Sequence, residues 1–292
     1  MKLEHFGLAL LVVAVWGINF VVIKVGLHQV PPFLMVGLRF TLAAIPAVFF
    51  VRRPNVPWRY LIGFGLALGV IHFGLLFFGL KNGVSAGMGS LLLQLQAFFT
   101  AGLGFVILRE RLKINQVAGM LLALAGIVVI ATVRDESINP LGLGIVALSA
   151  AFWGVANIIS KLAGKINMLG FVVWSSLVPP IPLFALSWLL EDHAQIRNVF
   201  SSPSFTSIWS LAYITYLSTL FGFSVWTWLL SNYPTNRVAP LTLLVPVFGM
   251  ASSSLFLGES FSAPKVIGAV LVACGLIVNV FGDQVLNRLR PA

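Results

Sequence analysis

The chain has 292 residues, of which 59% are hydrophobic and only 9% are charged, and its mean hydropathy is +1.01. Ordinary soluble domains carry about a quarter charged residues, so this composition excludes a soluble enzyme. The net charge of +10 would suggest nucleic-acid binding in a soluble protein, and its distribution along the chain decides what it means here. The single cysteine, Cys274, excludes an intramolecular disulfide and a multi-cysteine metal cluster.

The first apolar run follows Lys2 and extends over residues 6–25. It resembles a secretory signal peptide in its position. The run is longer than a signal sequence requires, and no small-x-small cleavage site follows it. We therefore expect this segment to remain in the protein as a membrane helix.

Apolar segments of membrane-spanning length recur along the whole chain, because a transmembrane helix needs about 20 mostly apolar residues. Charged or Pro/Asn-containing breaks divide the sequence into ten of them. The ten predicted spans are 6–25, 33–51, 60–80, 84–108, 114–133, 141–163, 169–190, 208–230, 238–257 and 264–282. The connections between them are short, so no separate soluble domain fits.

The basic residues are distributed unevenly between the two sides of this topology. With the N-terminus in the cytoplasm, 12 of the 18 Lys and Arg residues fall on the inner side, 5 on the outer side, and Arg39 lies within a span. This bias agrees with the positive-inside rule, so both termini are predicted to be cytoplasmic. The positive charge therefore indicates membrane orientation, and we expect no nucleic-acid partner.

Two sets of residues recur at fixed offsets. Trp16, Gly17 and Lys24 recur 137 residues later as Trp153, Gly154 and Lys161. The pairs with an offset of 149 are Leu108/Leu257, Glu110/Glu259, Gly119/Gly268 and Gly126/Gly275. A longer connection between the seventh and eighth spans accounts for the difference of 12. The sequence therefore predicts an internal repeat.

Each half of this repeat contains five spans, so the second half must enter the membrane in the opposite orientation. The predicted fold is an all-α membrane protein with ten transmembrane helices in a 5+5 inverted repeat. The first repeat is predicted over residues 1–134, the second over 138–284, and a short basic cytoplasmic tail over 285–292. Inverted repeats are typical of secondary transporters that work by alternating access.

The ordered motifs resemble the drug/metabolite transporter superfamily, specifically its ten-helix EamA type, over essentially the whole chain. The residues that carry the resemblance are Trp16-Gly17-x-Asn19-Phe20, Lys24, Leu38-Arg39-Phe40, Glu110-Arg111-Leu112, Gly119, Gly126, Trp153-Gly154, Pro246 and Gly258-Glu259. The chain departs from the family pattern at Arg109, where a glycine is usual, and this argues against a tight turn there.

A finer likeness runs from Leu8 through Phe49, with Val172-Val173-Trp174-Ser175 and Val238-Ala239-Pro240-Leu241 later in the chain. In these segments the sequence is similar to bacterial inner-membrane exporters of cysteine and O-acetylserine. The resemblance implies export of small amino-acid-related metabolites from a multi-pass protein of the bacterial inner membrane.

Ionisable groups within spans are candidate functional residues because they are costly in lipid. Arg39 could bind a substrate carboxylate, or it could pair with helix carbonyls or extend towards the membrane surface. His72 could take part in proton coupling, or it could be a neutral, hydrogen-bonded histidine. All eight acidic residues lie at termini or in loops, so no proton relay can use a carboxylate deep in a span.

Neutral polar residues on the first and sixth spans are the preferred candidates for lining a substrate path. Trp16, Asn19 and Ile23 share one helical face, as do Trp153, Asn157 and Ser160 on the repeat-related span. We expect the two faces to meet near the pseudo-two-fold axis. Including secondary candidates, the predicted substrate-binding residues are Trp16, Asn19, Arg39, His72, Gln94, Trp153, Asn157, Ser160 and Trp174.

Several further residues carry structural expectations. Gln94 and Gln96 should point to different sides of an α-helix, so we expect at most one of them on the path. Lys24 and Lys161 are expected to anchor span ends or to act as gates, and Glu110 and Glu259 to cap the helices that follow them. The paired glycines should let helices approach closely. The span prolines Pro46, Pro179, Pro180, Pro182 and Pro246 should interrupt the helices.

The leading hypothesis is a secondary transporter that exports cysteine-like or O-acetylserine-like metabolites by alternating access. Efflux of hydrophobic or aromatic drug-like compounds is the alternative within transporters. An intramembrane enzyme is disfavoured because no catalytic motif lies within the spans. We expect no cofactor and no metal, with a small amino-acid-like molecule and the lipid bilayer as partners. Coupling to protons and a monomeric state remain open expectations.

Overall fold

The computed structural model describes residues 2–132, 139–164, 167–233 and 238–289, and within these ranges the protein is all-helical. Nine helices or runs of helix are long and apolar enough to cross a membrane, and Ile114–Ile130 forms a shorter apolar helix. These ten elements follow the ten predicted spans in order. The prediction of an all-α membrane protein is confirmed.

The first half contains five spans, and three of them are interrupted. Their helices are α1 (Leu3–Gly26), α2 (Pro32–Ala44) with α3 (Ala47–Phe50), α4 (Trp58–Phe64) continuing through η1 (Gly65–His72) into α5 (Phe73–Lys81), α6 (Ala86–Leu92) continuing through η2 (Leu93–Leu95) into α7 (Gln96–Leu108), and α8 (Ile114–Ala131). The segment η1 is π-helical and η2 is a 3₁₀ turn.

The second half repeats this plan. Its helices are α9 (Pro140–Ala163), α10 (Met168–Ser175) with α11 (Pro180–Leu190), the short α12 (His193–Ser201), α13 (Phe205–Ala212) continuing through η3 (Tyr213–Phe221) into α14 (Gly222–Asn232), η4 (Ala239–Leu244) continuing into α16 (Val245–Leu257), and α17 (Ala263–Leu289). The segment η3 is π-helical and η4 is 3₁₀, as are their counterparts in the first half.

Helix boundaries follow from capping residues and prolines. Asn139, Asp192 and Ser204 each accept a backbone N–H at the start of the next helix, as is typical of N-caps. Pro46 lies at the break between α2 and α3, and Pro180 begins α11 after the break from α10. The predicted interruptions at these prolines are therefore present.

The turns that follow α7 and α16 are equivalent. Arg109 and Gly258 follow these helices with φ angles of 55° and 66°, which lie in the left-handed region. The tight turn is thus kept at Arg109 although a glycine would adopt it with less strain. The expectation of no tight turn at this position was wrong, because surrounding packing can impose a left-handed conformation on a single non-glycine residue.

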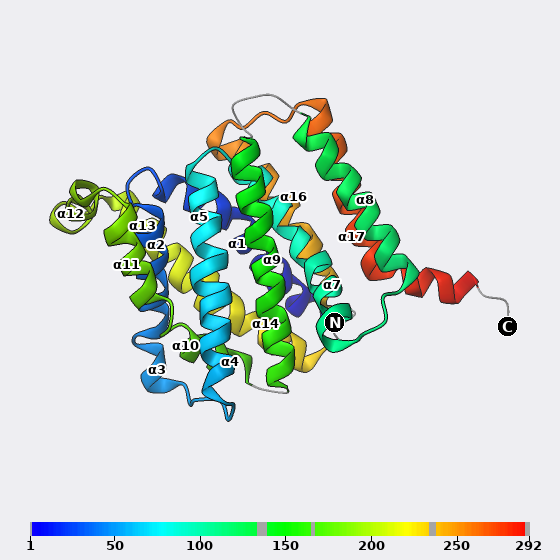
Figure 1. The fold of residues 1–292 in the computed structure, drawn as a ribbon, viewed down its shortest axis with the longest axis horizontal. Helices are drawn as coiled ribbons and strands as arrows, with labels where there is room; N and C mark the ends of the chain where they lie inside the picture. Colours follow the sequence, from blue (N-terminus) through cyan, green and yellow to red (C-terminus); the bar gives the residue numbers. More distant parts are fainter. Residues whose placement is uncertain (1, 133–138, 165–166, 234–237, 290–292) are drawn as a thin grey trace.

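The two repeat-related helices α8 and α17 pack side by side at one edge of the molecule (Figure 1). A Cβ atom added to Gly119 would lie 2.5 Å from the carbonyl oxygen of Gly275, and one added to Gly126 would lie 2.6 Å from that of Gly268. As the numbering rises along α8 it falls along α17, so these helices are antiparallel. The predicted close approach at the paired glycines and the inversion of the second half are both confirmed.

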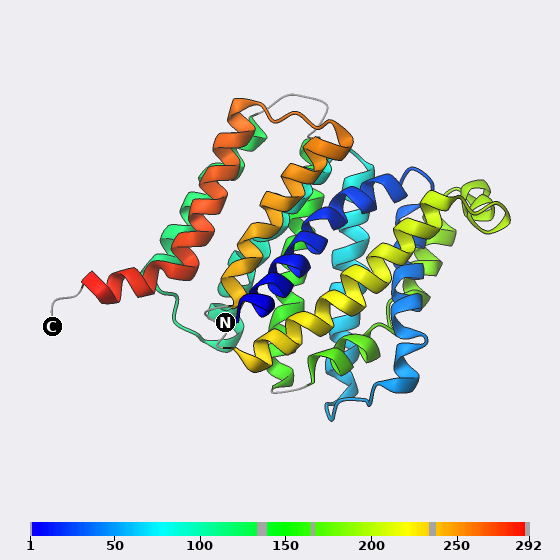
Figure 2. The ribbon, with the colours of Figure 1, turned by 180° about the vertical axis from the view of Figure 1, so that it is seen from behind.

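Contacts between the halves also follow the repeat. Helix α1 packs on α16, and its counterpart α9 packs on α7. Figure 2 shows α1 in dark blue running beside α16 in orange. The first and sixth spans therefore each lie against the other half, as expected for elements near a pseudo-two-fold axis.

Parts of three predictions lie outside the described residues. These are the end of the first repeat at residue 134, the start of the second at 138, and the basic residues Arg134, Lys165, Arg237 and Arg290. The predicted tail at 285–292 begins within α17, which continues as a helix to Leu289.

The glycine contacts between α8 and α17 predict a specific loss of stability. In Gly126→Ala the new methyl group meets the Gly268 carbonyl, and overpacking of this kind costs about 1–3 kcal/mol. We expect a lower apparent Tm for the purified variant in detergent. Gly144→Ala is the matched control, because nothing lies within 4 Å of its added Cβ and alanine favours the helix. Equal shifts in the two variants would contradict close packing at Gly126.

Candidate functional site

A cavity of about 220 Å³ lies between the two halves of the protein. Its wall includes residues of α1, α2, α9 and α10 and of all four π-helical or 3₁₀ segments. Eight of the nine predicted site residues line it: Trp16, Asn19, Arg39, His72, Gln94, Trp153, Asn157 and Ser160. The polar faces of the first and sixth spans thus meet at one space.

Trp174 is the predicted residue that the structure does not bring to this wall. Its indole Nε1 donates a hydrogen bond to the carbonyl oxygen of Val51 at 2.9 Å, and its ring packs edge-on against Trp58. This arrangement holds the side chain at the end of the second span. Trp174 is therefore not retained as a substrate-binding candidate.

Gln94 and Gln96 both line the cavity, in contrast to the expectation that at most one would do so. The expectation assumed an uninterrupted α-helix. The 3₁₀ turn Leu93–Leu95 has about three residues per turn, which places side chains two positions apart closer together around the axis than α-helical geometry does. Gln96 also accepts a hydrogen bond from Nδ2 of Asn157 at 2.8 Å, linking the fourth and sixth spans.

Arg39 is buried, with a relative exposure of 3%. Its Nε and Nη2 donate to Oγ1 of Thr219 at 3.1 and 2.9 Å, and its Cζ lies 4.2 Å from the centroid of the Phe73 ring. The Thr219 hydroxyl in turn donates to the carbonyl oxygen of Ile214 at 2.8 Å. In the part of the chain that the structure describes, the guanidinium therefore neither extends to the membrane surface nor pairs with helix carbonyls, which were the alternatives left open by the sequence.

His72 is fully buried beside Arg39 and contacts α9. Its Nδ1 lies 3.0 Å from the carbonyl oxygen of Ser149, and the Ser149 hydroxyl donates to the carbonyl oxygen of His72 at 2.9 Å. Nδ1 also lies 2.8 Å from the Ser149 hydroxyl oxygen. Because a carbonyl oxygen only accepts, the contact with the Ser149 carbonyl is a hydrogen bond in the tautomer that carries its hydrogen on Nδ1, and in that neutral tautomer Nε2 is an acceptor. The ring also packs against Trp153, with a centroid distance of 5.0 Å.

Three buried polar atoms of the cavity-lining side chains have no hydrogen-bond partner in the described structure. They are Nη1 of Arg39, Nε2 of His72 and Oδ1 of Asn19. Buried polar atoms without a partner are rare in native proteins and are costly. Their gathering on one cavity marks it as the place where a polar ligand would be accommodated.

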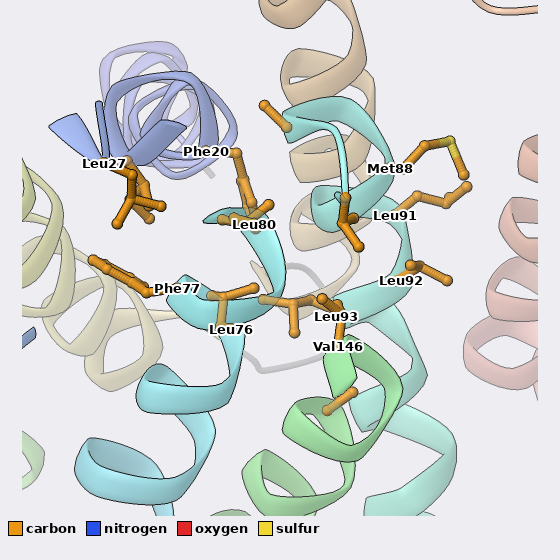
Figure 3. Packing of buried hydrophobic residues seen from close by; sticks show 14 of the residues in the cluster. Phe20, Leu27, Leu76, Phe77, Leu80, Met88, Leu91, Leu92, Leu93 and Val146 are labelled. Atoms are coloured by element: carbon orange, nitrogen blue, oxygen red, sulfur yellow. The ribbon is translucent and has the colours of Figure 1, made fainter. Parts of the chain in front are cut away.

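The end of the cavity near Lys24 is closed by packed side chains. Figure 3 shows Phe20, Leu80 and Leu93 among the buried residues that α1, α5, α6 and η2 direct towards one another. Lys24 Nζ donates to the carbonyl oxygens of Leu80 and Val84. Lys24 thereby joins the end of α1 to the connection between α5 and α6.

Glu259 also lies at the Lys24 end of the cavity, where its side chain binds backbone groups. Its carboxylate accepts the backbone N–H groups of Ala86 at 2.7 Å and Gly87 at 3.1 Å. It therefore caps α6 and not the helix that follows it, which corrects the sequence expectation. The left-handed residue Gly258 before it reverses the chain and directs the glutamate back into the bundle.

The opposite end of the cavity reaches Ser160 and Met168. Here Lys161 Nζ lies 2.7 Å from Oε1 of Glu110, and both side chains are about half exposed, at 53% and 49%. Glu110 thus forms an ion pair and does not cap the helix after it, again because a left-handed residue, Arg109, precedes it. The repeat-related pairs Lys24/Glu259 and Lys161/Glu110 therefore lie at opposite ends, one within a packed region and one exposed.

Thr219 and the four non-α segments were missed from the sequence. Thr219 lies 147 positions after His72, close to the offset of 149 that relates the later spans. That spacing could have indicated Thr219 as the repeat counterpart of His72. However, no residues that are identical in the two repeats mark the segment around Thr219.

Comparison with known proteins decides the family. The model of the EamA-like transporter family matches residues 6–132 and 140–281. The chain belongs to the EamA-like transporter family. It is accordingly a multi-pass membrane transporter and not an enzyme.

Individual relatives of this EamA protein span its whole length. A probable amino-acid metabolite efflux pump of Salmonella typhimurium is 45% identical over 97% of both chains. A protein with the same description from Escherichia coli is 44% identical over 94% of both chains. An uncharacterized transporter of Bacillus subtilis, YoaV, is 28% identical over 92% of this chain and 94% of its own. A crystal structure that is 19% identical matches all of both chains with a TM-score of 0.67, which supports the fold.

The hydroxyl of Thr219 holds the guanidinium of Arg39, and this contact predicts a stability effect. In Thr219→Val the shape is nearly kept but two hydrogen bonds to a buried charge are lost, and such bonds contribute about 1.5–3 kcal/mol. We expect a lower apparent Tm for the purified protein. Thr219→Ser keeps the hydroxyl and should stay close to wild type. Equal Tm values for the valine and serine variants would show that the contact does not stabilise the fold.

Proposed function

We propose that this EamA protein exports small amino-acid-related metabolites, of the cysteine and O-acetylserine kind, across the bacterial inner membrane by alternating access. The observation that carries the proposal is the cavity between the repeats, with its amide, histidine and arginine groups beside aromatic walls. The two relatives described as probable amino-acid metabolite efflux pumps support the same class of substrate.

The cavity size supports a small substrate. Pockets for drug-sized ligands enclose about 300–1,000 Å³, and this cavity encloses about 220 Å³. A buried guanidinium on the wall also disfavours lipophilic cations, since like charges repel in a medium of low dielectric constant. Efflux of hydrophobic or aromatic drug-like compounds is therefore the less favoured function.

The two ends of the cavity support alternating access. The Lys24 end is sealed by the packed core, whereas the lining continues to Ser160 beside the exposed Lys161–Glu110 pair. With the N-terminus in the cytoplasm, as the basic residues predict, the Lys161 end faces the cytoplasm. We propose that the state described is closed to the outside, and that exchanging the conformations of the two repeats opens the Lys24 end.

Transport itself is tested with purified protein in liposomes. We expect wild type to move labelled cysteine or O-acetylserine faster than protein-free liposomes do. Asn157→Leu should lower the initial rate by about tenfold, because it removes hydrogen bonds to Gln96 and Thr100 and places an apolar group in the cavity. Ser187→Ala, outside the cavity, is the control. Absence of flux for every amino acid tested would overturn the substrate class.

Proton coupling is tested in the same assay. A pH gradient across the liposome should change the rate for wild type but not for His72→Ala if His72 couples protons to export. Gradient-insensitive flux in wild type would instead indicate facilitated diffusion without proton coupling.

Alternating access is tested by cysteine labelling on a Cys274→Ala background, which removes the single native cysteine. Ser160→Cys should react with a membrane-impermeant thiol reagent from the cytoplasmic side. Ile23→Cys, on the same face as Trp16 and Asn19 but fully buried, should be protected at rest and become reactive from the outside during turnover. Protection of Ile23→Cys throughout active transport, or labelling of Ser160→Cys from outside alone, would contradict this scheme.

A further inference from the structure

The three unpartnered atoms on the cavity wall have complementary hydrogen-bonding character. Nη1 of Arg39 only donates. Nε2 of His72 accepts in the neutral tautomer that carries its hydrogen on Nδ1, and Oδ1 of Asn19 accepts. The described polar atoms that lack partners at this cavity therefore divide into one cationic donor and two neutral acceptors.

The charge of Arg39 is not compensated within the described protein. Its contacts there are the Thr219 hydroxyl and the faces of Phe73 and Phe40, and none of them is anionic. Removing an ion from water is costly unless an opposite charge compensates it. An anionic group placed in the cavity at Nη1 would supply that compensation.

The orientation of the guanidinium is fixed before any ligand arrives. Thr219 holds Nε and Nη2, and its own hydrogen is committed to the Ile214 carbonyl oxygen, so its oxygen lone pairs face the guanidinium. Nη1 is left without a hydrogen-bond partner, and Arg39 is one of the residues that line the cavity. A donor held in this way binds a carboxylate with little further loss of conformational entropy.

The donor and one acceptor are also near each other. The Phe73 ring packs against both, with its centroid 4.2 Å from Cζ of Arg39 and 4.5 Å from the centroid of the His72 ring. Asn19, 7% exposed, lines the same cavity from α1. A single small molecule can therefore contact both kinds of group.

We infer that the cavity recognises the two charged groups of an α-amino acid separately, with Arg39 binding the carboxylate and Asn19 and His72 accepting hydrogen bonds from the ammonium group. This inference rests on the proposed function and deepens it. It assigns Thr219 as a positioning residue that acts through Arg39. It also predicts that substrate side chains face the aromatic wall, where Trp16, Trp153 and Phe223 lie.

The first test needs no variant of the protein. Binding is measured as ligand-induced thermal stabilisation of purified wild type, with three probes: O-acetyl-L-serine, its methyl ester, and 3-acetoxypropanoate. The ester lacks the carboxylate charge and the propanoate lacks the ammonium group. We expect each analogue to bind at least about tenfold more weakly than the amino acid, as the loss of one charged hydrogen-bonding group predicts.

Variants then show which residue recognises the carboxylate and which recognises the ammonium group. Arg39→Gln should abolish discrimination against the ester while keeping discrimination against 3-acetoxypropanoate. Asn19→Leu should reduce discrimination against 3-acetoxypropanoate and keep that against the ester. Ser187→Ala is the matched control, since its buried hydroxyl also has no partner but lies outside the cavity. Arg39→Lys replaces Arg39→Gln if the latter does not fold, and should keep the preference for the carboxylate with weaker binding.

The outcomes separate this inference from the proposed function. If wild type transports O-acetylserine but binds the ester or 3-acetoxypropanoate as tightly as the amino acid, separate recognition of the two charged groups (the two-pole site) is wrong. The proposed export then stands. The two-pole site is also wrong if Arg39→Gln and Asn19→Leu weaken binding of all three probes by one common factor. If wild type neither binds nor transports any amino acid, the proposed function fails and this inference fails with it.

Discussion

A backbone within lipid has to satisfy its own hydrogen bonds, because no water is present to do so. Besides the breaks between α2 and α3 and between α10 and α11, the described spans contain four segments of other helical type, the π-helical η1 and η3 and the 3₁₀ segments η2 and η4. Each of the four contributes at least one side chain to the cavity wall. These four segments therefore face a protein-lined space, and there the backbone gains partners such as Trp16, whose indole donates to the Ser218 carbonyl oxygen at 3.0 Å.

The repeat is symmetric in backbone and asymmetric in chemistry. Helices α7 and α16 begin and end 149 residues apart, and the left-handed residues after them keep the same spacing. The groups with unpartnered atoms at the cavity, Asn19, Arg39 and His72, all belong to the first half. At the offset of 137 the positions that correspond to Asn19 and Arg39 are Ala156 and Ser176. Among the described residues, the second half thus supplies walls and support, including Thr219, while the first half supplies the cavity-lining groups with unpartnered atoms.

Much of this architecture could be predicted from the sequence, because lipid imposes a strong and simple pattern. The length of each apolar run indicated ten spans, and recurring Trp, Lys, Glu and Gly residues indicated the inverted repeat. The helical spacing of Trp16 with Asn19 and of Trp153 with Asn157 placed both faces on the cavity, since each depends only on local α-helical geometry. Seven of the eight candidate residues on the wall were chosen for this reason or because ionisable groups within lipid are costly, and Gln94 is the exception.

The failures have a common physical cause, which is that they depend on non-α backbone or on tertiary contacts. The expectation for Gln94 and Gln96 assumed the rotation per residue of an α-helix, whereas the segment between them is a 3₁₀ turn. Trp174 was placed by its residue type, whereas its indole is held by the Val51 carbonyl oxygen. Glu259 was expected to cap its own helix, but a chain reversal carries its carboxylate to α6.

The central claim is that an amino acid occupies the cavity between Arg39 and Asn19. The most direct test is an experimental structure of the protein with O-acetyl-L-serine at saturating concentration. We expect ligand density in the cavity, with the carboxylate within hydrogen-bonding distance of Nη1 of Arg39 and the ammonium group beside Asn19 and His72. An occupied site elsewhere, or a ligand bound with its carboxylate away from Arg39, would contradict this claim.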